Sequence, residues 1–238
     1  MTVTIERREV VPSEGLSNLS PLLQRIYSAR DIQTVDDLDK ALVGLLPFGD
    51  LLHIDEAARQ LSAAVRDNQR ILIVGDFDVD GATSTSVAVL ALKSFGAKQV
   101  DYLVPNRFEF GYGLSPDIVD HAQSMNPDLI VTVDNGISSR EGVARARELG
   151  IAVLVTDHHL AGEGVPTDCV IVNPNQSGCT FRSKAMAGVG VIFYVMLALR
   201  RYCSEQSYFD SKGIPEPNMG TFLDLVTLGT IADVVPLD

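Results

Sequence analysis

The stretch ILIVGDFDVDGATST, residues 71–85, decides how this chain folds. It opens with a continuous apolar run, which is typical of a strand that is buried on both faces. Three aspartates follow at alternate positions, Asp76, Asp78 and Asp80, and small residues suited to a helix come next. Like charges this close repel one another, and a bound cation is the usual compensation in a folded protein. The stretch therefore predicts a strand, a metal-binding turn and a helix.

The same strand-to-helix pattern repeats along the chain. Apolar runs typical of strands lie at 70–77, 101–106, 128–136, 151–159 and 168–174, and helical patterns lie at 51–69, 82–97, 115–125 and 138–150. Ser115 followed by Pro116 predicts a helix start, and Gly96 and Gly150 close two of the helices. Buried strands that alternate with helices predict an α/β fold, namely a doubly wound, mainly parallel sheet with helices on both faces.

The domain organisation follows from where this pattern begins. Residues 1–50 contain turn-forming residues and a mixed amphipathic segment, which predict a short helical N-terminal extension. Residues 51–238 carry the regular pattern and are predicted to form one domain. The longest uncharged apolar stretch, residues 185–199, is shorter than the roughly 20 residues that a membrane span needs. We therefore expect a buried helix there and no membrane association.

Composition narrows the class of protein. The chain has 238 residues, of which 46% are hydrophobic and 21% charged, as is typical of globular proteins. Its N-terminus lacks a secretory pattern, and its three cysteines lack metal-site spacing, so we expect inert thiols in the cytoplasm. The net charge of −12 argues by itself against nucleic-acid binding. Acids gathered around a divalent cation would soften that argument, and so would a basic face on a part of the protein outside this chain.

Polar side chains gather where the predicted strands end. Ligands of open α/β sheets bind beyond the carboxyl ends of the strands, and the carboxylates and imidazoles found there are Asp76, Asp78, Asp80, Asp134, Asp157, His158 and His159. Asp233 follows a predicted helix and can return to the same rim. A set this rich in oxygen favours Mn²⁺ or Mg²⁺ over zinc. Because neighbouring side chains of extended backbone point to opposite sides, we expect at most one of the two histidines to face a given ion.

The loop at residues 104–115 predicts a phosphate-binding element. Arg107 offers a two-pronged guanidinium for phosphate, Gly111 and Gly113 permit close backbone approach, and a helix begins after the loop. The alternative is that Arg107 forms a surface salt bridge.

The acids at the strand ends could also hold two metal ions. In enzymes that hydrolyse a phosphodiester with two ions, the ions are typically about 3.5–4 Å apart.

Two other metal motifs resemble Asp76–Gly81. An EF-hand loop would require a glutamate at position 87, where this chain has Val87, and a helix in place of the preceding strand. Calcium sensing is therefore excluded. A haloacid-dehalogenase-like phosphatase also starts with Asp-x-Asp after a strand, but it expects Thr or Val where this chain has Ala82, and it does not use a histidine pair.

Five motifs resemble, in order, those of the DHH phosphoesterase family. They are GDFDVDGATS (75–84), PNRFEFGYGLSP (105–116), LIVTVDNGISS (129–139), VTDHHL (155–160) and LGTIADVVPL (228–237). The sequences of these motifs are most similar to those of the single-strand-specific exonucleases of the family, and the resemblance extends from about residue 45 to the end. It implies 5′-to-3′ degradation of single-stranded DNA to 5′-mononucleotides with two Mn²⁺ or Mg²⁺ ions, in recombination and mismatch repair.

The resemblance also implies roles for single residues. Asp78 and Asp80 would each hold one ion, Asp134 would bridge both, and His158 and Asp233 would complete the second set of ligands. His159 would contact the scissile phosphate and Asp157 would orient the neighbouring imidazole. Asp76 is either a ligand of the first ion or a support for the loop.

Such family members also have a second domain with a Gly-Gly-Gly-His motif and an oligonucleotide-binding barrel. This chain contains neither that motif nor further sequence after Asp238, so the resemblance implies the N-terminal portion of such an enzyme. Single-stranded DNA is the implied substrate and single-strand-binding protein a partner. Two alternatives stay open at this point: a phosphodiesterase for short oligonucleotides or cyclic dinucleotides, and a non-catalytic fragment.

Overall fold

The computed structural model describes residues 9–38, 44–162 and 164–237. Contacts divide the chain into two compact units, Met1–Leu46 and Pro47–Asp238, so the division falls four residues before the boundary expected after residue 50. The described part of the first unit contains short helices: η1 (Glu14–Leu16), α1 (Pro21–Ser28) and η2 (Asp36–Leu38). Ser20 caps α1 by accepting a hydrogen bond from the amide of Leu23.

The second unit contains the predicted sheet. Its strands are β1 (Ile71–Gly75), β2 (Val100–Leu103), β3 (Leu129–Val133), β4 (Ala152–Thr156) and β5 (Val170–Val172). They lie in the order β2-β1-β3-β4-β5, and every neighbouring pair is parallel. The predicted fold class is confirmed, because all five predicted apolar runs form strands of one parallel sheet.

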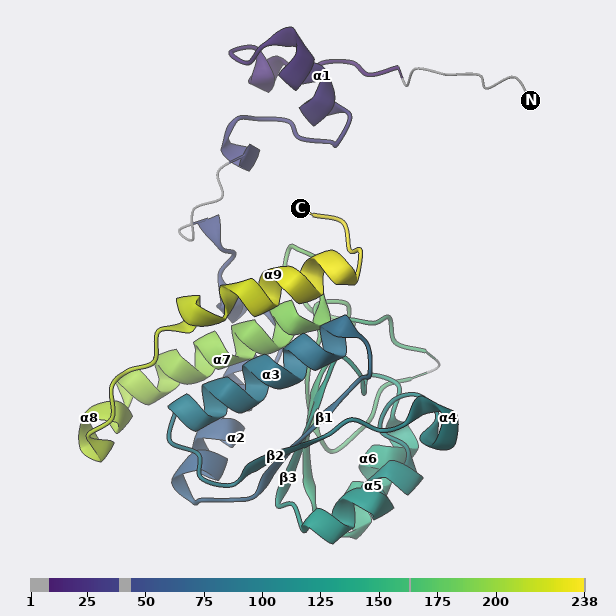
Figure 1. Ribbon diagram of the computed structural model, residues 1–238, viewed down its shortest axis with the longest axis vertical. Helices are drawn as coiled ribbons and strands as arrows, with labels where there is room; N and C mark the ends of the chain where they lie inside the picture. The colour runs from purple at the N-terminus through teal and green to yellow at the C-terminus, as the bar shows by residue number, and fades with distance from the viewer. Residues whose placement is uncertain (1–8, 39–43, 163, 238) are drawn as a thin grey trace. The chain divides into compact units, whose positions relative to one another are not determined.

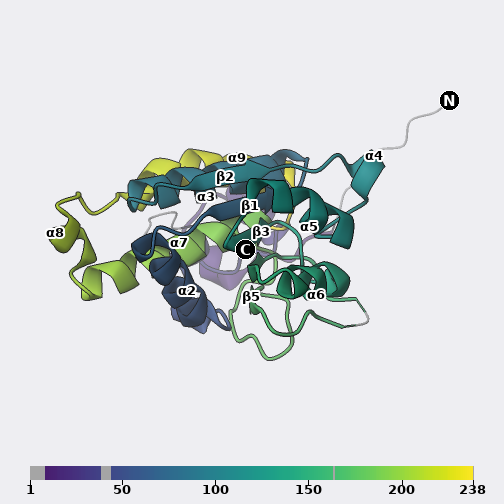
Figure 2. The same cartoon turned by 90° about the horizontal axis from the view of Figure 1, so that it is seen from below.

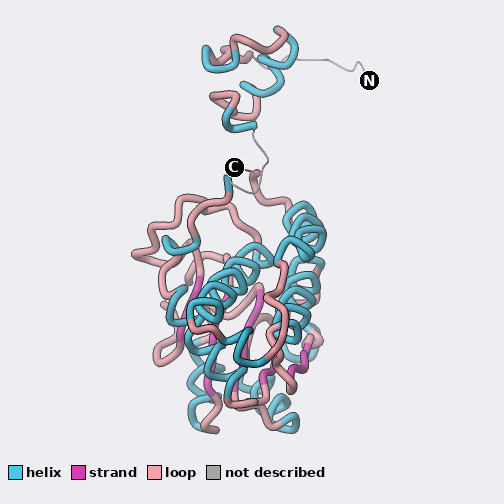
Figure 3. Tube along the Cα trace, turned by 90° about the vertical axis from the view of Figure 1, so that its left-hand side faces the viewer, coloured by secondary structure: helices cyan, strands magenta, loops and turns pink. Residues whose placement is uncertain are grey.

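Helices cover both faces of this sheet (Figures 1 and 2). Their bounds are η4 (Phe48–Asp50), α2 (Ile54–Arg66), α3 (Val79–Ser94), α4 (Arg107–Phe110), α5 (Pro116–Ala122), η5 (Gln123–Met125), α6 (Arg140–Glu148), α7 (Gly188–Glu205), α8 (Tyr208–Lys212), η6 (Met219–Phe222) and α9 (Leu223–Ala232). Helices α5 and α6 lie on one face, and α2, α3 and α7 lie on the other, with α9 packed outside α3 and α7. Figure 3 shows the strands between these helical layers.

Alternate side chains of the strands fill the two cores. Leu72, Val74, Ile130, Val153 and Val155 are buried in one cluster with residues of α5 and α6. Their neighbours along the strands, such as Ile73, Val131 and Leu154, are equally buried. Both faces of every central strand are therefore apolar, which is why the strands read as continuous apolar runs.

Two helices differ from the prediction. Helix α3 begins at Val79, three residues early, because Asp78 caps it by accepting a hydrogen bond from the amide of Gly81. Asp80 therefore lies in the first turn of a helix and not in a loop. Helix α7 is buried as predicted but extends to Glu205, and Cys203 in its last turn is still buried. No helix in the described ranges is long and apolar enough to cross a membrane.

The packing of α6 against the start of α5 depends on Gly142. A Cβ atom at this position would lie 1.8 Å from the carbonyl oxygen of Leu114, a backbone atom that cannot rotate away. We expect Gly142→Ala to lower the free energy of unfolding by about 1–3 kcal/mol, as overpacking typically does, although alanine favours helices. Thermal unfolding of the metal-free protein measures the change. Gly49→Ala is the control, because nothing lies within 4 Å of that Cβ; equal melting temperatures would contradict the expectation.

Candidate metal centre

The register of the sheet places the predicted acids next to one another at the carboxyl-terminal edge of the sheet. Gly75, Val133 and Thr156 are register partners in three neighbouring strands, so the residues that follow them, Asp76, Asp134 and Asp157, leave the sheet side by side. The amide of Asp134 donates to the carbonyl oxygen of Thr156 at 3.1 Å and thereby extends the ladder by one step. Parallel pairing alone therefore assembles a carboxylate rim at the carboxyl ends of the strands.

One group of possible ligands follows β1. Ligand oxygens of Asp76, Asp78 and Asp134 all lie within 4.8 Å of one another. The backbone places the first two: the Asp76 carboxylate accepts a hydrogen bond from the amide of Phe77 at 2.7 Å, and Asp78 is the N-cap of α3. These three carboxylates can hold one divalent cation by oxygen ligands.

A second group surrounds His158. Its Nε2 atom lies 3.2 Å from Oδ1 of Asp134, 3.6 Å from Oδ2 of Asp233 and 3.8 Å from Oδ2 of Asp80. Asp233 is the C-cap of α9, so that helix returns the end of the chain to the rim as expected. Ligand atoms of Asp80, His158 and Asp233 lie within 4.8 Å of one another, which is a second place for a cation.

Asp134 connects the two groups, because it belongs to the first and its ligand atoms also lie within 4.8 Å of those of His158 and His159. It is 2% exposed and has a φ of 62°, a left-handed conformation that Asp and Asn tolerate better than other non-glycine residues. Burial raises the pKa of its carboxyl to about 7. A neighbouring cation would therefore stabilise its buried negative charge.

Two orphaned atoms test whether these residues fit a metal. Oδ1 of Asp134 and Nε2 of His158 are both buried and lie 3.2 Å from each other, and neither forms a well-aligned hydrogen bond with the described residues. Buried polar atoms without partners are costly and require an explanation. A carboxylate oxygen and an imidazole nitrogen that converge in this way suit a divalent cation, and the surrounding oxygens favour Mn²⁺ or Mg²⁺.

Asp80 has a structural task besides its place in the second group. Oδ2 accepts a hydrogen bond from the amide of Gly188 at 2.6 Å, and Oδ1 accepts one from the amide of Val189 at 2.8 Å. These are the first two amides of α7, so Asp80 caps a helix that begins 108 residues later. Burial raises the pKa of Asp80 despite these bonds.

The histidine pair differs from the expectation. The two ring centroids lie only 4.4 Å apart, and both histidines come after the end of β4 at Thr156, so the alternation of side chains along a strand does not apply to them. Oδ1 of the fully buried Asp157 lies 2.8 Å from Nδ1 of His159 and also accepts from the backbone amides of both histidines. The hydrogen bond with Asp157 raises the pKa of His159 to about 9. Asp157 therefore holds His159 in place and stabilises its charged form.

Arg107 pairs with an acid of the rim. Its Nη2 atom donates to both carboxylate oxygens of Asp76, at 2.8 and 3.1 Å, and its guanidinium lies 3.9 Å from the centre of the Phe77 ring. The structure therefore contains the salt bridge that was the alternative interpretation of Arg107. The Nε and Nη1 atoms have no hydrogen-bond partner in the described part of the chain, so donors remain for a further group.

Sequence reasoning missed two residues that belong to the rim. The hydroxyl of Tyr112 lies 3.2 Å from Nδ1 of His159 and 3.3 Å from the carbonyl oxygen of Asp134, and burial raises its pKa. The buried side-chain amide of Asn135 donates to the carbonyl oxygens of Val74 and Val133, which ties β1 to β3. Both stand inside the quoted motifs, and their motif positions were the signal that could have identified them.

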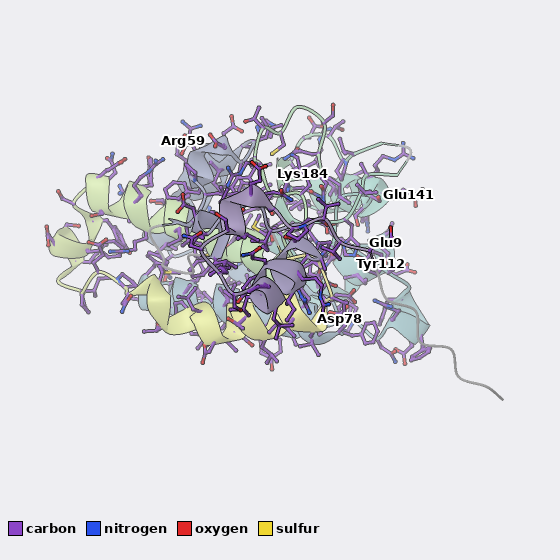
Figure 4. All side chains as sticks on the ribbon, turned by 90° about the horizontal axis from the view of Figure 1, so that it is seen from above. Glu9, Arg59, Asp78, Tyr112, Glu141 and Lys184 are labelled. Carbon is purple, nitrogen blue, oxygen red and sulfur yellow. The ribbon has the colours of Figure 1, made fainter. Side chains whose placement is uncertain are left out.

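A hollow of about 460 Å³ adjoins His159 and Asp157. Tyr112, Ile137, Ser139 and Arg140 are among the residues that line it. Figure 4, which is seen from above, labels Tyr112 and Glu141, which both line the hollow, and Asp78 of the first ligand group. The rim therefore combines a metal-binding cluster with adjacent space for a bound group.

Comparison with known proteins gives a family and relatives. The model described as "DHH family, N-terminal domain" matches residues 70–230. RecJ of Escherichia coli K12, a curated single-stranded-DNA-specific exonuclease, is 52% identical over 237 residues, which cover 99% of this chain and 41% of that protein. RecJ of Haemophilus influenzae is 52% identical over 238 residues, covering 100% of this chain and 41% of its own length.

A solved structure agrees with these relatives. RecJ of Thermus thermophilus in complex with Mn²⁺ matches with a TM-score of 0.73 at 32% identity, and the match covers 94% of this chain and 30% of that one. The chain spans about two fifths of the length of the curated relatives named above. The expectation that the likeness begins near residue 45 was too narrow, because it covers almost the whole chain.

Proposed function

The chain belongs to the DHH family, and on that premise we propose that it is the catalytic part of a metal-dependent exonuclease. It would degrade single-stranded DNA from the 5′ end and release 5′-mononucleotides. The 52% identity to the E. coli exonuclease supports this substrate over the small phosphodiesters that were the alternative. We further propose residues 51–238 as the phosphoesterase domain.

The observation that carries the proposal is the place of Asp134 between the two groups. Its carboxylate stands between Asp76 and Asp78 on one side and His158 on the other. A shared carboxylate between two clusters is what a two-ion phosphodiesterase needs, because the two ions must lie close enough to act on one phosphate. A non-catalytic relative would have no need to keep every one of these ligands.

Each ligand has a proposed place. Asp76, Asp78 and Asp134 would hold the first Mn²⁺ or Mg²⁺ ion, and Asp134, Asp80, His158 and Asp233 would hold the second. When bound, such ions polarise a phosphodiester and offset the charge on its attacking and leaving oxygens. No side chain then has to serve as nucleophile.

The neighbouring residues would act on the substrate directly. His159, kept charged and oriented by Asp157, can donate a hydrogen bond from Nε2 to an oxygen of the scissile phosphate. The unpaired Nε and Nη1 atoms of Arg107 can donate to a second phosphate of the strand, while Asp76 keeps the guanidinium in position. Both contacts would hold the phosphodiester against the ligand cluster.

The relatives also support a cellular role. We infer a place in DNA recombination and mismatch repair in the cytoplasm, with single-strand-binding protein as a partner, from the likeness to RecJ proteins. Co-sedimentation with purified single-strand-binding protein tests the partner.

The proposed function is tested by incubating the protein with a 5′-phosphorylated single-stranded oligonucleotide and Mn²⁺. We expect 5′-mononucleotides to appear from the 5′ end, and a matched duplex to be spared. Asp78→Asn is the inactive variant, because asparagine keeps the N-cap of α3 while one anionic ligand is lost. We expect at least about a 100-fold lower rate, from loss of part of the several kcal/mol that metal ions contribute.

A small ester separates the remaining outcomes. Bis(p-nitrophenyl) phosphate needs no strand binding, so Mn²⁺-dependent hydrolysis of it in the parent and not in Asp78→Asn would support a catalytic cluster. Faster turnover of cyclic dinucleotides or two-residue oligonucleotides than of long strands would favour the small-substrate alternative. Absence of any Mn²⁺-dependent hydrolysis would overturn the proposal.

A further inference from the structure

Three large aromatic side chains are exposed beside the metal centre. Phe77 follows β1 and is 54% exposed, Phe108 lies in α4 after β2 and is 98% exposed, and Tyr112 follows α4 and is 50% exposed. We call these three residues the aromatic rim. Other phenylalanines of the chain, such as Phe95 and Phe181, are fully buried. The exposed rings therefore contribute little to the core, and their place in the fold needs another reason.

Arg107 ties the aromatic rim to the metal-ligand cluster. Its guanidinium lies 3.9 Å from the centre of the Phe77 ring and 5.3 Å from that of Tyr112, so the cation faces both rings. The same guanidinium binds Asp76, which belongs to the first ligand group. The rings of Phe77 and Tyr112 are thus held within one or two side chains of the place where a phosphodiester would be cleaved, and Phe108 follows Arg107 directly in α4.

The aromatic rim, together with Arg107, has the chemistry of a surface that binds an unpaired nucleobase. Single-strand-binding surfaces combine cationic groups for the backbone with aromatic faces on which bases stack, and any base can stack because each has a π face. Here the cation and one of the rings come from adjacent residues, Arg107 and Phe108. A base in a duplex is already stacked and paired, so it would have to leave the helix to contact Phe108.

We propose that the aromatic rim is a stacking surface for a base of the single strand whose phosphates approach the metal centre, with Phe108 as its principal contact. The inference rests on the proposed function, and it adds a reason for the preference for single strands. In this arrangement the base stacks on the aromatic rim, and Arg107 binds the adjoining phosphate. A fully exposed phenylalanine is then explained as a binding residue.

The test measures binding and not turnover. Fluorescence anisotropy of a labelled oligothymidylate of about 12 residues, within the usual span of single-strand sites, gives the dissociation constant, with Ca²⁺ in place of Mn²⁺ to hold the cluster without rapid hydrolysis. We expect Phe108→Ala to weaken binding about 5- to 150-fold, the range found when one base–aromatic stack is removed. Because Phe108 is 98% exposed, the fold is not at risk. Phe108→Trp should bind like the parent, and Phe108→Leu should bind as weakly as the alanine variant.

A matched control and a changed substrate make the result specific. Tyr102 is also aromatic and 61% exposed but lies in β2 outside the rim, so Tyr102→Ala should bind like the parent. A second series of oligonucleotides lacks one base at successive positions near the 5′ end. Removal of the base that stacks on Phe108 should weaken binding to the parent, and with that oligonucleotide Phe108→Ala should cause no further loss of affinity.

Three results would overturn the stacking proposal. The first is equal binding by Phe108→Ala and the parent, and the second is full binding by Phe108→Leu. The third is that Phe108→Ala weakens binding by the same factor whichever base is missing from the oligonucleotide. Bis(p-nitrophenyl) phosphate carries no base, so Mn²⁺-dependent hydrolysis of it by the parent tests the proposed function separately. Hydrolysis together with any of these results rejects the stacking surface alone.

Discussion

Replacing Asp134 with asparagine is expected to abolish binding at both metal positions and to lower the rate of nucleotide release by at least about 1,000-fold, since two bound ions contribute several kcal/mol of transition-state stabilisation. Each 1.36 kcal/mol corresponds to about a factor of ten in rate. Asparagine suits the test because it tolerates the φ of 62° at this position, where alanine would be strained. The change therefore removes charge and leaves the backbone.

The measurement is a calorimetric titration with Mn²⁺, combined with the exonuclease assay. The parent should bind about two ions per chain, Asp78→Asn about one, and Asp134→Asn none at the same concentrations. Asp117→Asn, an exposed acid in the first turn of α5, is the control and should behave like the parent. If Asp134→Asn kept both ions and most of the rate, the shared-ligand assignment would be wrong.

Asp80→Ala is expected to destabilise the metal-free protein by about 2–6 kcal/mol, because it leaves the first two amides of α7 without their acceptor and each buried unsatisfied group costs about 1–3 kcal/mol. The comparison is Asp78→Ala, which loses a single N-cap bond at an exposed position and should cost about 1 kcal/mol. Chemical denaturation in the presence of a chelator measures both values.

This prediction changes which variant serves as an inactive control. Asp80→Ala would lose activity through the fold as well as through the metal, so its inactivity would not identify a ligand. Asp78→Asn and Asp134→Asn keep the local backbone and are the more specific choices. Equal stability of the Asp80→Ala and Asp78→Ala proteins would show that the amides of α7 find other partners.

The sequence by itself determined the sheet and the kind of site. Strands that are buried on both faces leave continuous apolar runs, and this local pattern identified the central strands β1, β3 and β4, whereas the edge strand β2 is exposed at Asp101 and Tyr102. Because parallel strands end at one edge, the acids near the ends of segments 70–77, 128–136 and 151–159 were predicted to meet, and Asp76, Asp134 and Asp157 do leave the sheet side by side. The oxygen-rich residue types then indicated the class of cation.

Only the tertiary structure decided how these residues divide their tasks. Asp80 binds the start of α7 across 108 residues, and Arg107 binds Asp76 across 31. Asn135 joins β1 to β3 across 61 residues, and the two histidine rings contact each other because the chain leaves the strand at Thr156. Such contacts depend on where distant segments come together and on local backbone angles. Residue pattern and spacing carry no signal for either, whereas burial on both faces leaves a continuous apolar run in each central strand.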